Sequence, residues 1–127
     1  MKLHIPIFIF LLVSKAAFAQ TLRYDKITNE GKFTEYFSKS GESIKINDTI
    51  EIGYPGNGSR FNFITQGNEP AGVIIANTKV VVTKIKSIGN PKRGYKAYLF
   101  FSGYGLLPVV IDYESALETH EVKRKIN

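Results

Sequence analysis

The sequence predicts a small all-β domain, an SH3-like or OB-like barrel of about six strands with a short C-terminal helix. Three observations lead to this prediction. From residue 20 onward, short segments alternate apolar and polar residues with the period of two that is typical of half-buried strands. Turn signals made of Gly, Pro and Asn separate these segments, and only the last one has helical character.

The first 19 residues predict a cleavable secretory signal peptide. Lys2 and His4 precede an apolar run at residues 5–13, and residues 17–19 (AFA) supply the small-x-small pattern that signal peptidase recognises. An apolar run of this length is too short to span a bilayer, which takes roughly 20 residues. We therefore expect a protein exported to the periplasm or the cell exterior, with residues 20–127 forming one domain and no transmembrane segment after cleavage.

Composition narrows the function classes further. The chain has no cysteine, which excludes disulfides, thiolate nucleophiles, cysteine-based zinc sites and a lipid-modified N-terminal Cys. It has 17 basic and 11 acidic residues, and loss of Lys2 and Lys15 with the signal leaves 15 − 11, a net charge of +4. This modest excess favours anionic surfaces weakly. Nucleic acid is not an expected partner of an exported protein.

The N-terminal half of the domain predicts three strands. Residues 31–37 (GKFTEYF) carry aromatic side chains on both faces of one short strand. Ile44 and Ile46, and then Ile50 and Ile52, alternate with polar residues. Asn47 and Asp48 lie between these two pairs and predict a bend or bulge.

The middle of the chain is dominated by turn signals. Residues 53–59 (GYPGNGS) predict a turn connecting two antiparallel strands, the second at residues 60–64. Residues 66–72 predict a loop and residues 73–76 a brief extended segment.

The C-terminal part contains the most β-branched segment. Residues 79–88 (KVVVTKIKSI) predict one long strand, with residues 95–102 as its hairpin partner. Residues 107–111 predict another strand, which Pro108 places at an edge or a strand start. Asp112 is a suitable N-cap for a helix at residues 113–119.

Two segments resemble a known group of proteins. Residues 41–53 (GESIKINDTIEIG) and 111–118 (IDYESALE) resemble corresponding parts of small exported β-rich proteins of unknown function from Bacteroidetes-type bacteria. This chain departs from them after the helix, where Thr119 and His120 stand in place of an expected Gly. The resemblance implies a fold class and a compartment, and it brings no catalytic residues.

The sequence offers weak candidates for catalysis or metal binding. His120 is the only histidine after residue 19, and it follows the end of the predicted helix, so we interpret it as a surface residue. Glu114, Glu118 and Glu121 share one helical face, but they supply too few ligands for calcium, so we expect a solvated acidic face. No pattern predicts a metal ion or a cofactor.

Two further catalytic alternatives depend on spacing. A carboxylate-based hydrolase needs an acid and a base across a cleft. The candidate carboxylates, among which spacing selects no pair, are Glu35, Glu42, Asp48, Glu51 and Glu69. The glycine-rich loop at residues 53–59 lacks the Lys-Ser/Thr pair and the helix that a phosphate-binding loop requires.

The predicted hairpin gives the strongest binding candidate. Its lysines and aromatics alternate, so one set of side chains faces outward and places Lys96 and Tyr98 beside Lys84 and Lys86. Cations beside aromatic rings can stack on sugars or bases. The alternative is that the aromatics belong to the core and the lysines protect a sheet edge from pairing.

These observations favour a non-enzymatic exported module that binds an envelope protein or an anionic glycan. Two alternatives stay open, a carboxylate-based hydrolase acting on glycan or cell-wall material and a structural subunit of an envelope assembly. The sequence does not indicate an oligomeric state.

Overall fold

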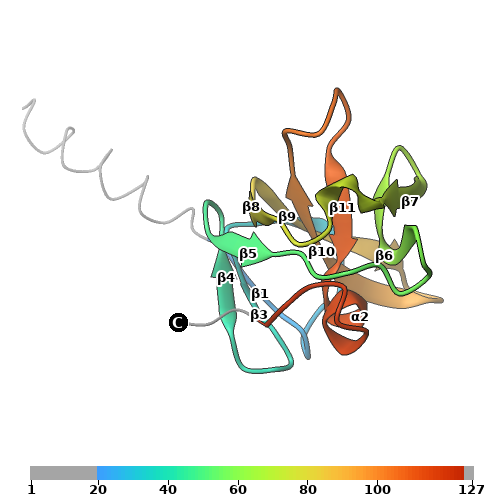
Figure 1. Ribbon diagram of the computed structural model, residues 1–127. Coiled ribbons are helices and arrows are strands. Elements are labelled where there is room, and N and C mark those ends of the chain that lie inside the picture. The colour runs from blue at the N-terminus through green and yellow to red at the C-terminus, as the bar shows by residue number, and fades with distance from the viewer. Residues whose placement is uncertain (1–19, 125–127) are drawn as a thin grey trace, which may run out of the picture.

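The computed structural model describes residues 20–124, so the predicted signal peptide lies outside the described residues (Figure 1). These residues form eleven short strands, one 3₁₀ turn and one α-helix. In chain order they are β1 (Thr21–Arg23), β2 (Gly31–Phe33), β3 (Glu35–Phe37), β4 (Ser43–Lys45), β5 (Thr49–Glu51), β6 (Arg60–Gln66), β7 (Glu69–Gly72), η1 (Val73–Ile75), β8 (Lys79–Val81), β9 (Lys84–Asn90), β10 (Gly94–Phe101), β11 (Val109–Asp112) and α2 (Tyr113–Glu118). Within residues 20–124 no helix is long and apolar enough to span a bilayer.

The strands assemble into three open sheets. The largest has the order β2-β9-β10-β11-β6-β7, a second has the order β1-β3-β4, and the third pairs β5 with β8. The prediction of a mostly β fold with a short C-terminal helix is confirmed. A closed barrel is not, because the two outermost strands of the six-stranded sheet, β2 and β7, do not pair with each other.

Two segments predicted as single strands are each divided between sheets. Residues 31–37 form β2, which pairs with β9, and β3, which pairs with β1 and β4. Residues 79–88 divide between β8, which pairs with β5, and β9, which pairs with β2 and β10. At this break the Val82 N–H donates to the Asp48 carbonyl and the Thr83 N–H to the Phe100 carbonyl. Both predictions were wrong because β-branched and aromatic residues suit either sheet, and distant strands determine which one they join.

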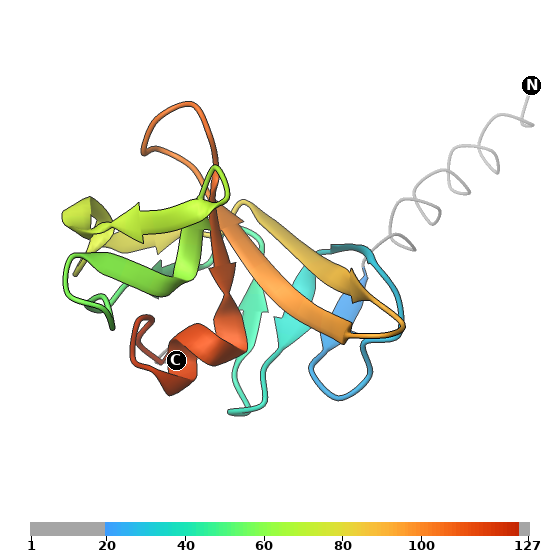
Figure 2. The same ribbon diagram turned by 90° about the vertical axis from the view of Figure 1, so that its right-hand side faces the viewer.

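The connections also differ from the predicted ones. The loop at residues 53–59 joins β5 to β6, which are not partners of each other. Residues 66–72, predicted as a loop, instead complete a β6–β7 hairpin whose turn places Gly67 and Asn68 at φ values of 62° and 63°. Residues 73–75 form the turn η1 rather than an extended segment. The hairpin predicted between residues 79–88 and 95–102 is confirmed for residues 84 onward, which form the antiparallel pair β9–β10 that crosses the molecule as two long strands in Figure 2.

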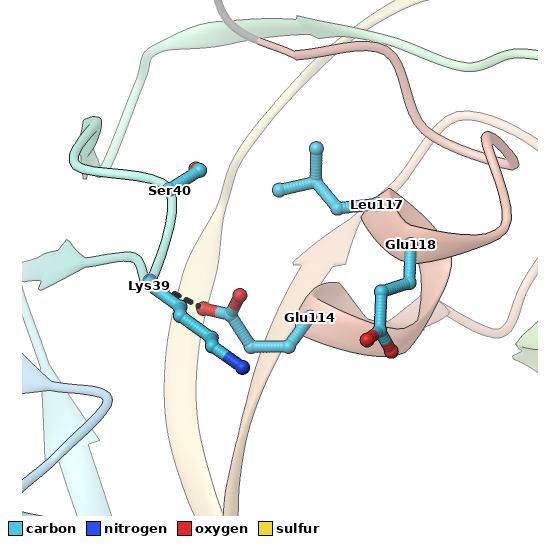
Figure 3. Close-up of a pocket in the computed structure, with 5 residues that line it drawn as sticks. All are labelled: Lys39, Ser40, Glu114, Leu117 and Glu118. Carbon is cyan, nitrogen blue, oxygen red and sulfur yellow. Dashed lines mark hydrogen bonds between the residues drawn. The ribbon is translucent and has the colours of Figure 1, made fainter.

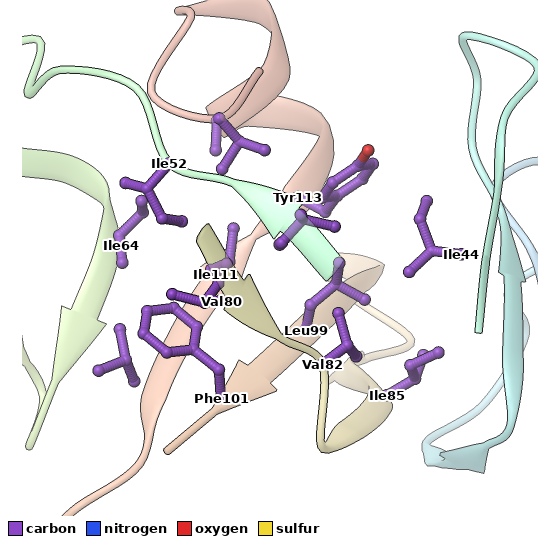
Figure 4. Packing of buried hydrophobic residues seen from close by; sticks show 14 of the residues in the cluster. Ile44, Ile52, Ile64, Val80, Val82, Ile85, Leu99, Phe101, Ile111 and Tyr113 are labelled. Atoms are coloured by element: carbon purple, nitrogen blue, oxygen red, sulfur yellow. The ribbon is translucent and has the colours of Figure 1, made fainter. Parts of the chain in front are cut away.

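The three sheets and α2 share one hydrophobic core, part of which is shown in Figure 4. Along β10, Ala97, Leu99 and Phe101 point inward, as the alternation predicts. Opposite them lie side chains from the other elements, among them Ile44 of β4 and Val80 of β8. The large sheet therefore has one face buried in this core.

The C-terminal segment is held close to the body. The predicted N-cap Asp112 makes no capping hydrogen bond; its Oδ2 instead accepts one from the Nζ of Lys96 at 2.5 Å. After α2 the chain turns back along β5, where Val122 bridges to Ile52 and the Lys123 N–H donates to the Glu51 carbonyl. Val122 and Lys123 thus lie along the edge of β5 in the two-stranded sheet.

Candidate functional site

The outward face of β2, β9 and β10 gathers the four residues that the sequence singled out. In register, Lys86 lies directly opposite Tyr98, and Lys84 lies opposite Phe100. Residues opposite each other in an antiparallel pair project to the same side. Lys96 has the same parity as Tyr98 on β10, so it shares this side, away from the buried Ala97 and Leu99. We call this surface the lysine face, formed by Lys32, Lys84, Lys86, Lys96, Tyr98 and Phe100.

Aromatic and charged groups on the lysine face contact one another. The Nζ atoms of Lys84 and Lys86 lie 5.3 and 5.9 Å from the centroid of the Phe100 ring. The Nζ of Lys96 donates to the Asp112 carboxylate and, at 3.1 Å, to the Ser115 hydroxyl. The phenol of Tyr98 is half-buried, and burial and then the charge of Asp112 raise its pKa, against a smaller opposing effect of Lys96. The Phe100 ring is therefore a surface group that contacts two lysine ammonium groups.

Three of the four lysines on this face have no ion-pair partner among residues 20–124. Lys32 of β2 lies directly opposite Lys86 of β9, and like charges in such a position repel. Among residues 20–124, Lys96 is the only member of the face with an ion-pair partner. The alternative that the lysines protect an exposed edge is wrong for β9 and β10, because both are interior strands of the sheet.

A pocket that the sequence did not reveal lies between the turn after β3 and helix α2 (Figure 3). It has a volume of about 350 Å³ and is lined by Lys39, Ser40, Glu114, Leu117 and Glu118. Its two walls come from segments about 75 residues apart in the chain. Local sequence patterns contain no signal for such a contact.

Glu114 is fixed in this pocket by donors from β3 and the turn that follows it. Its carboxylate accepts hydrogen bonds from the Tyr36 hydroxyl, from the Ser38 hydroxyl at 3.0 Å and from the Lys39 N–H at 3.2 Å. Tyr113 makes a corresponding bond to the buried carboxylate of Glu42. The Tyr36 and Tyr113 rings meet edge to face with centroids 6.1 Å apart.

These two tyrosines are buried hydrogen-bond donors. Burial, followed by the neighbouring carboxylates, raises the pKa of the Tyr36 hydroxyl and of the Tyr113 hydroxyl well above the ordinary value of 10.0. Both hydroxyls therefore stay protonated at neutral pH. The two tyrosine–glutamate bonds fasten α2 to the three-stranded sheet.

The predicted solvated acidic face does not exist, because the three glutamates have different environments. Glu118 is exposed, Glu114 is half-buried and Glu121 is completely buried. The helix ends at Glu118, and His120, at a φ of 64°, turns the chain so that Glu121 points inward. His120 is exposed, in agreement with its interpretation as a surface residue.

Glu121 occupies the glycine-rich loop considered as a phosphate cradle. Its carboxylate accepts backbone N–H bonds from Gly56 at 2.7 Å, Asn62 at 2.8 Å and Phe63 at 2.8 Å. A bound anion at this loop would compete for the same donors. The loop is therefore closed by a carboxylate of the chain itself.

The carboxylates considered for a hydrolase are dispersed. Glu35 accepts a bond from the Ser43 hydroxyl at 2.6 Å, Asp48 accepts the Lys45 N–H at 2.8 Å, and Glu51 pairs with Lys123 at 3.0 Å. Glu69 is exposed on β7, and neither it nor the buried Glu42 lines the pocket. Within the described residues no group of three or more acidic or histidine side chains is placed to hold a metal ion.

Comparison with protein-family profiles, with curated proteins and with solved structures finds no match to this chain.

Proposed function

We propose that this protein is a non-enzymatic binding module that holds an anionic glycan on its lysine face. The observation that carries the proposal is the positive charge on the lysine face, where Lys32 of the outermost strand β2 lies directly opposite Lys86 of the interior strand β9. An anionic group lying between the two ammonium groups would relieve their repulsion. The half-buried ring of Tyr98 adds a surface for the apolar face of a sugar.

The composition of the face favours a polyanionic glycan over a folded protein partner. Lysine is depleted in protein–protein interfaces, whereas arginine is enriched, and this face has four lysines and no arginine. Protein interfaces also depend on central aromatic anchors that fill pockets. Here Phe100 lies beneath two lysine ammonium groups instead of projecting freely.

The same proposal includes export of the protein and an SH3-like or OB-like origin of its fold. The pattern at residues 1–19 supports delivery to the periplasm or the cell exterior, where an anionic glycan is available. The sharing of one core by several small sheets is compatible with an opened SH3-like or OB-like barrel.

Binding measurements with charged and neutral polysaccharides test the proposal. The chain from residue 20 is titrated with polygalacturonate, dextran sulfate and neutral dextran at low and high salt. We expect both polyanions to bind, neutral dextran not to bind, and the affinity to fall as salt screens the charges. Binding of polyglutamate with higher affinity than either glycan would contradict the glycan assignment.

A matched pair of double variants separates the lysine face from net charge. Lys84→Gln with Lys86→Gln removes two charges from the face, and Lys26→Gln with Lys79→Gln removes two exposed charges elsewhere. If each face lysine contributes about 0.7–1 kcal/mol, the first variant weakens binding about 10- to 30-fold. The second is expected to change it less than about twofold. Equal losses in both variants would refute a localised site.

A further inference from the structure

We infer that the pocket between the β3–β4 turn and α2 is a second binding site, for a small zwitterion with an apolar side chain, such as a free amino acid or a dipeptide. Figure 3 shows Lys39 and Ser40 on one side of the pocket and Glu114, Leu117 and Glu118 on the other. A volume of about 350 Å³ lies at the lower end of the range for small-molecule sites. Positive, negative and apolar groups thus surround one small cavity.

The α2 wall is suited to an ammonium group. Glu114 is held in place by bonds from Tyr36, Ser38 and Lys39, so its carboxylate is positioned before a ligand arrives. Most of these bonds are to Oε2; the bond to Oε1 that the structure shows comes from the Ser38 hydroxyl at 3.2 Å. Since each carboxylate oxygen has two lone pairs, Oε1 can accept a further N–H donor.

Glu118 adds a second negative charge to this wall. It follows Glu114 by four residues, so both carboxylates lie on the same side of the helix. Glu118 is exposed, and within residues 20–124 its carboxylate forms no ion pair or hydrogen bond. A ligand ammonium between these two carboxylates would have two anionic acceptors.

The opposite wall is suited to a carboxylate. The Nζ of Lys39 has no ion-pair partner among the described residues, although Glu114 and Glu118 line the same cavity. The turn that carries Lys39 is held by Arg124, whose Nη2 donates a hydrogen bond to the Ser40 carbonyl at 2.8 Å. Leu117, partly buried against the core, supplies an apolar surface for the ligand's side chain.

No residue of the lysine face lines this pocket, so the two proposals can fail separately. The test is a titration followed by NMR with leucine, leucyl-leucine, N-acetyl-leucine, which lacks the ammonium, and leucinamide, which lacks the carboxylate. We expect saturable shifts at residues of the pocket with leucine or leucyl-leucine, at a Kd of about a millimolar. Each analogue is expected to bind about fivefold more weakly or worse. Tighter binding of leucyl-leucine would identify a peptide source, and tighter binding of leucine a free amino acid.

Charge-removing variants locate the site. Glu118→Gln and Lys39→Gln are each expected to weaken binding about three- to fivefold. The matched controls Glu69→Gln and Lys26→Gln remove exposed charges elsewhere and should leave the Kd unchanged. The inference is overturned if no shift saturates up to about 50 mM ligand, if both analogues bind as well as leucine, or if the controls weaken binding equally.

Discussion

Replacing Glu121 with Gln is expected to destabilise the fold strongly, although the two side chains have nearly the same shape. The carboxylate is completely buried and accepts N–H bonds from Gly56, Asn62 and Phe63. The amide of Gln keeps one acceptor oxygen and turns the other into an NH₂ donor. If the remaining oxygen keeps the bonds to Gly56 and Asn62, the Phe63 N–H faces another donor.

The magnitude follows from these three bonds. A buried N–H without a partner costs about 1–3 kcal/mol. The two remaining bonds lose their charge assistance, about 1 kcal/mol each. Relief from burying a charge offsets part of this loss, so we expect Glu121→Gln to lower the free energy of unfolding by about 3 kcal/mol. Small domains have about 5–15 kcal/mol in total, and the corresponding fall in melting temperature is about 12 °C.

Urea denaturation followed by circular dichroism and tyrosine fluorescence measures this change. The matched control is Glu118→Gln on the same segment, which is exposed and should stay within about 0.5 kcal/mol of the parent. A loss below about 1 kcal/mol for Glu121→Gln would refute the reasoning. It would mean that the loop at residues 53–59 does not depend on the carboxylate.

Two further predictions concern alkaline pH and close packing. Burial raises the pKa of Tyr36 and of Tyr113 above the ordinary value of 10.0, so the stability they provide is fully present below pH 10 and is lost as the pH rises beyond it. In a titration at 295 nm both should ionise only on unfolding, and their ionisation in the folded protein near pH 10 would contradict the assignment. A Cβ at Gly53 would lie 2.3 Å from the backbone oxygen of His120, so Gly53→Ala should cost about 2–4 kcal/mol or prevent folding. Gly72→Ala, with nothing within 4 Å, is the control for thermal melting and should be nearly neutral.

The lysine face was the part of the candidate site that the sequence predicted best. Alternation along β10 is a local property of the chain, so Tyr98 could be assigned to the side opposite Leu99 without knowing the fold. The hairpin register that places Lys86 opposite Tyr98 follows from a short-range turn. The local sequence does not indicate which strands flank the hairpin. Sequence analysis therefore missed the pairing of Lys32 with Lys86 and the interior position of β9.

Glu121 shows why helical spacing misled. Its position seven residues after Glu114 predicts a shared face only if the helix continues. The helix ends at Glu118, and the positive φ of His120 redirects the chain. The donors that receive Glu121 lie on a loop and strand 58–65 residues earlier. No property of the C-terminal segment alone indicates that such donors exist.

The sequence by itself therefore determined the mostly β class, the β9–β10 hairpin, the short terminal helix and the outward side of β10, since each depends on periodicity or turn chemistry within a few residues. Tertiary structure alone decided how residues 31–37 and 79–88 divide between sheets, where Glu121 is buried and that Glu114 lines a pocket. Each of these outcomes joins segments far apart in the chain, as in the bond between Tyr36 and Glu114 across 78 residues. A local pattern shows which face of a strand is apolar, and only the assembled sheets determine what that face contacts.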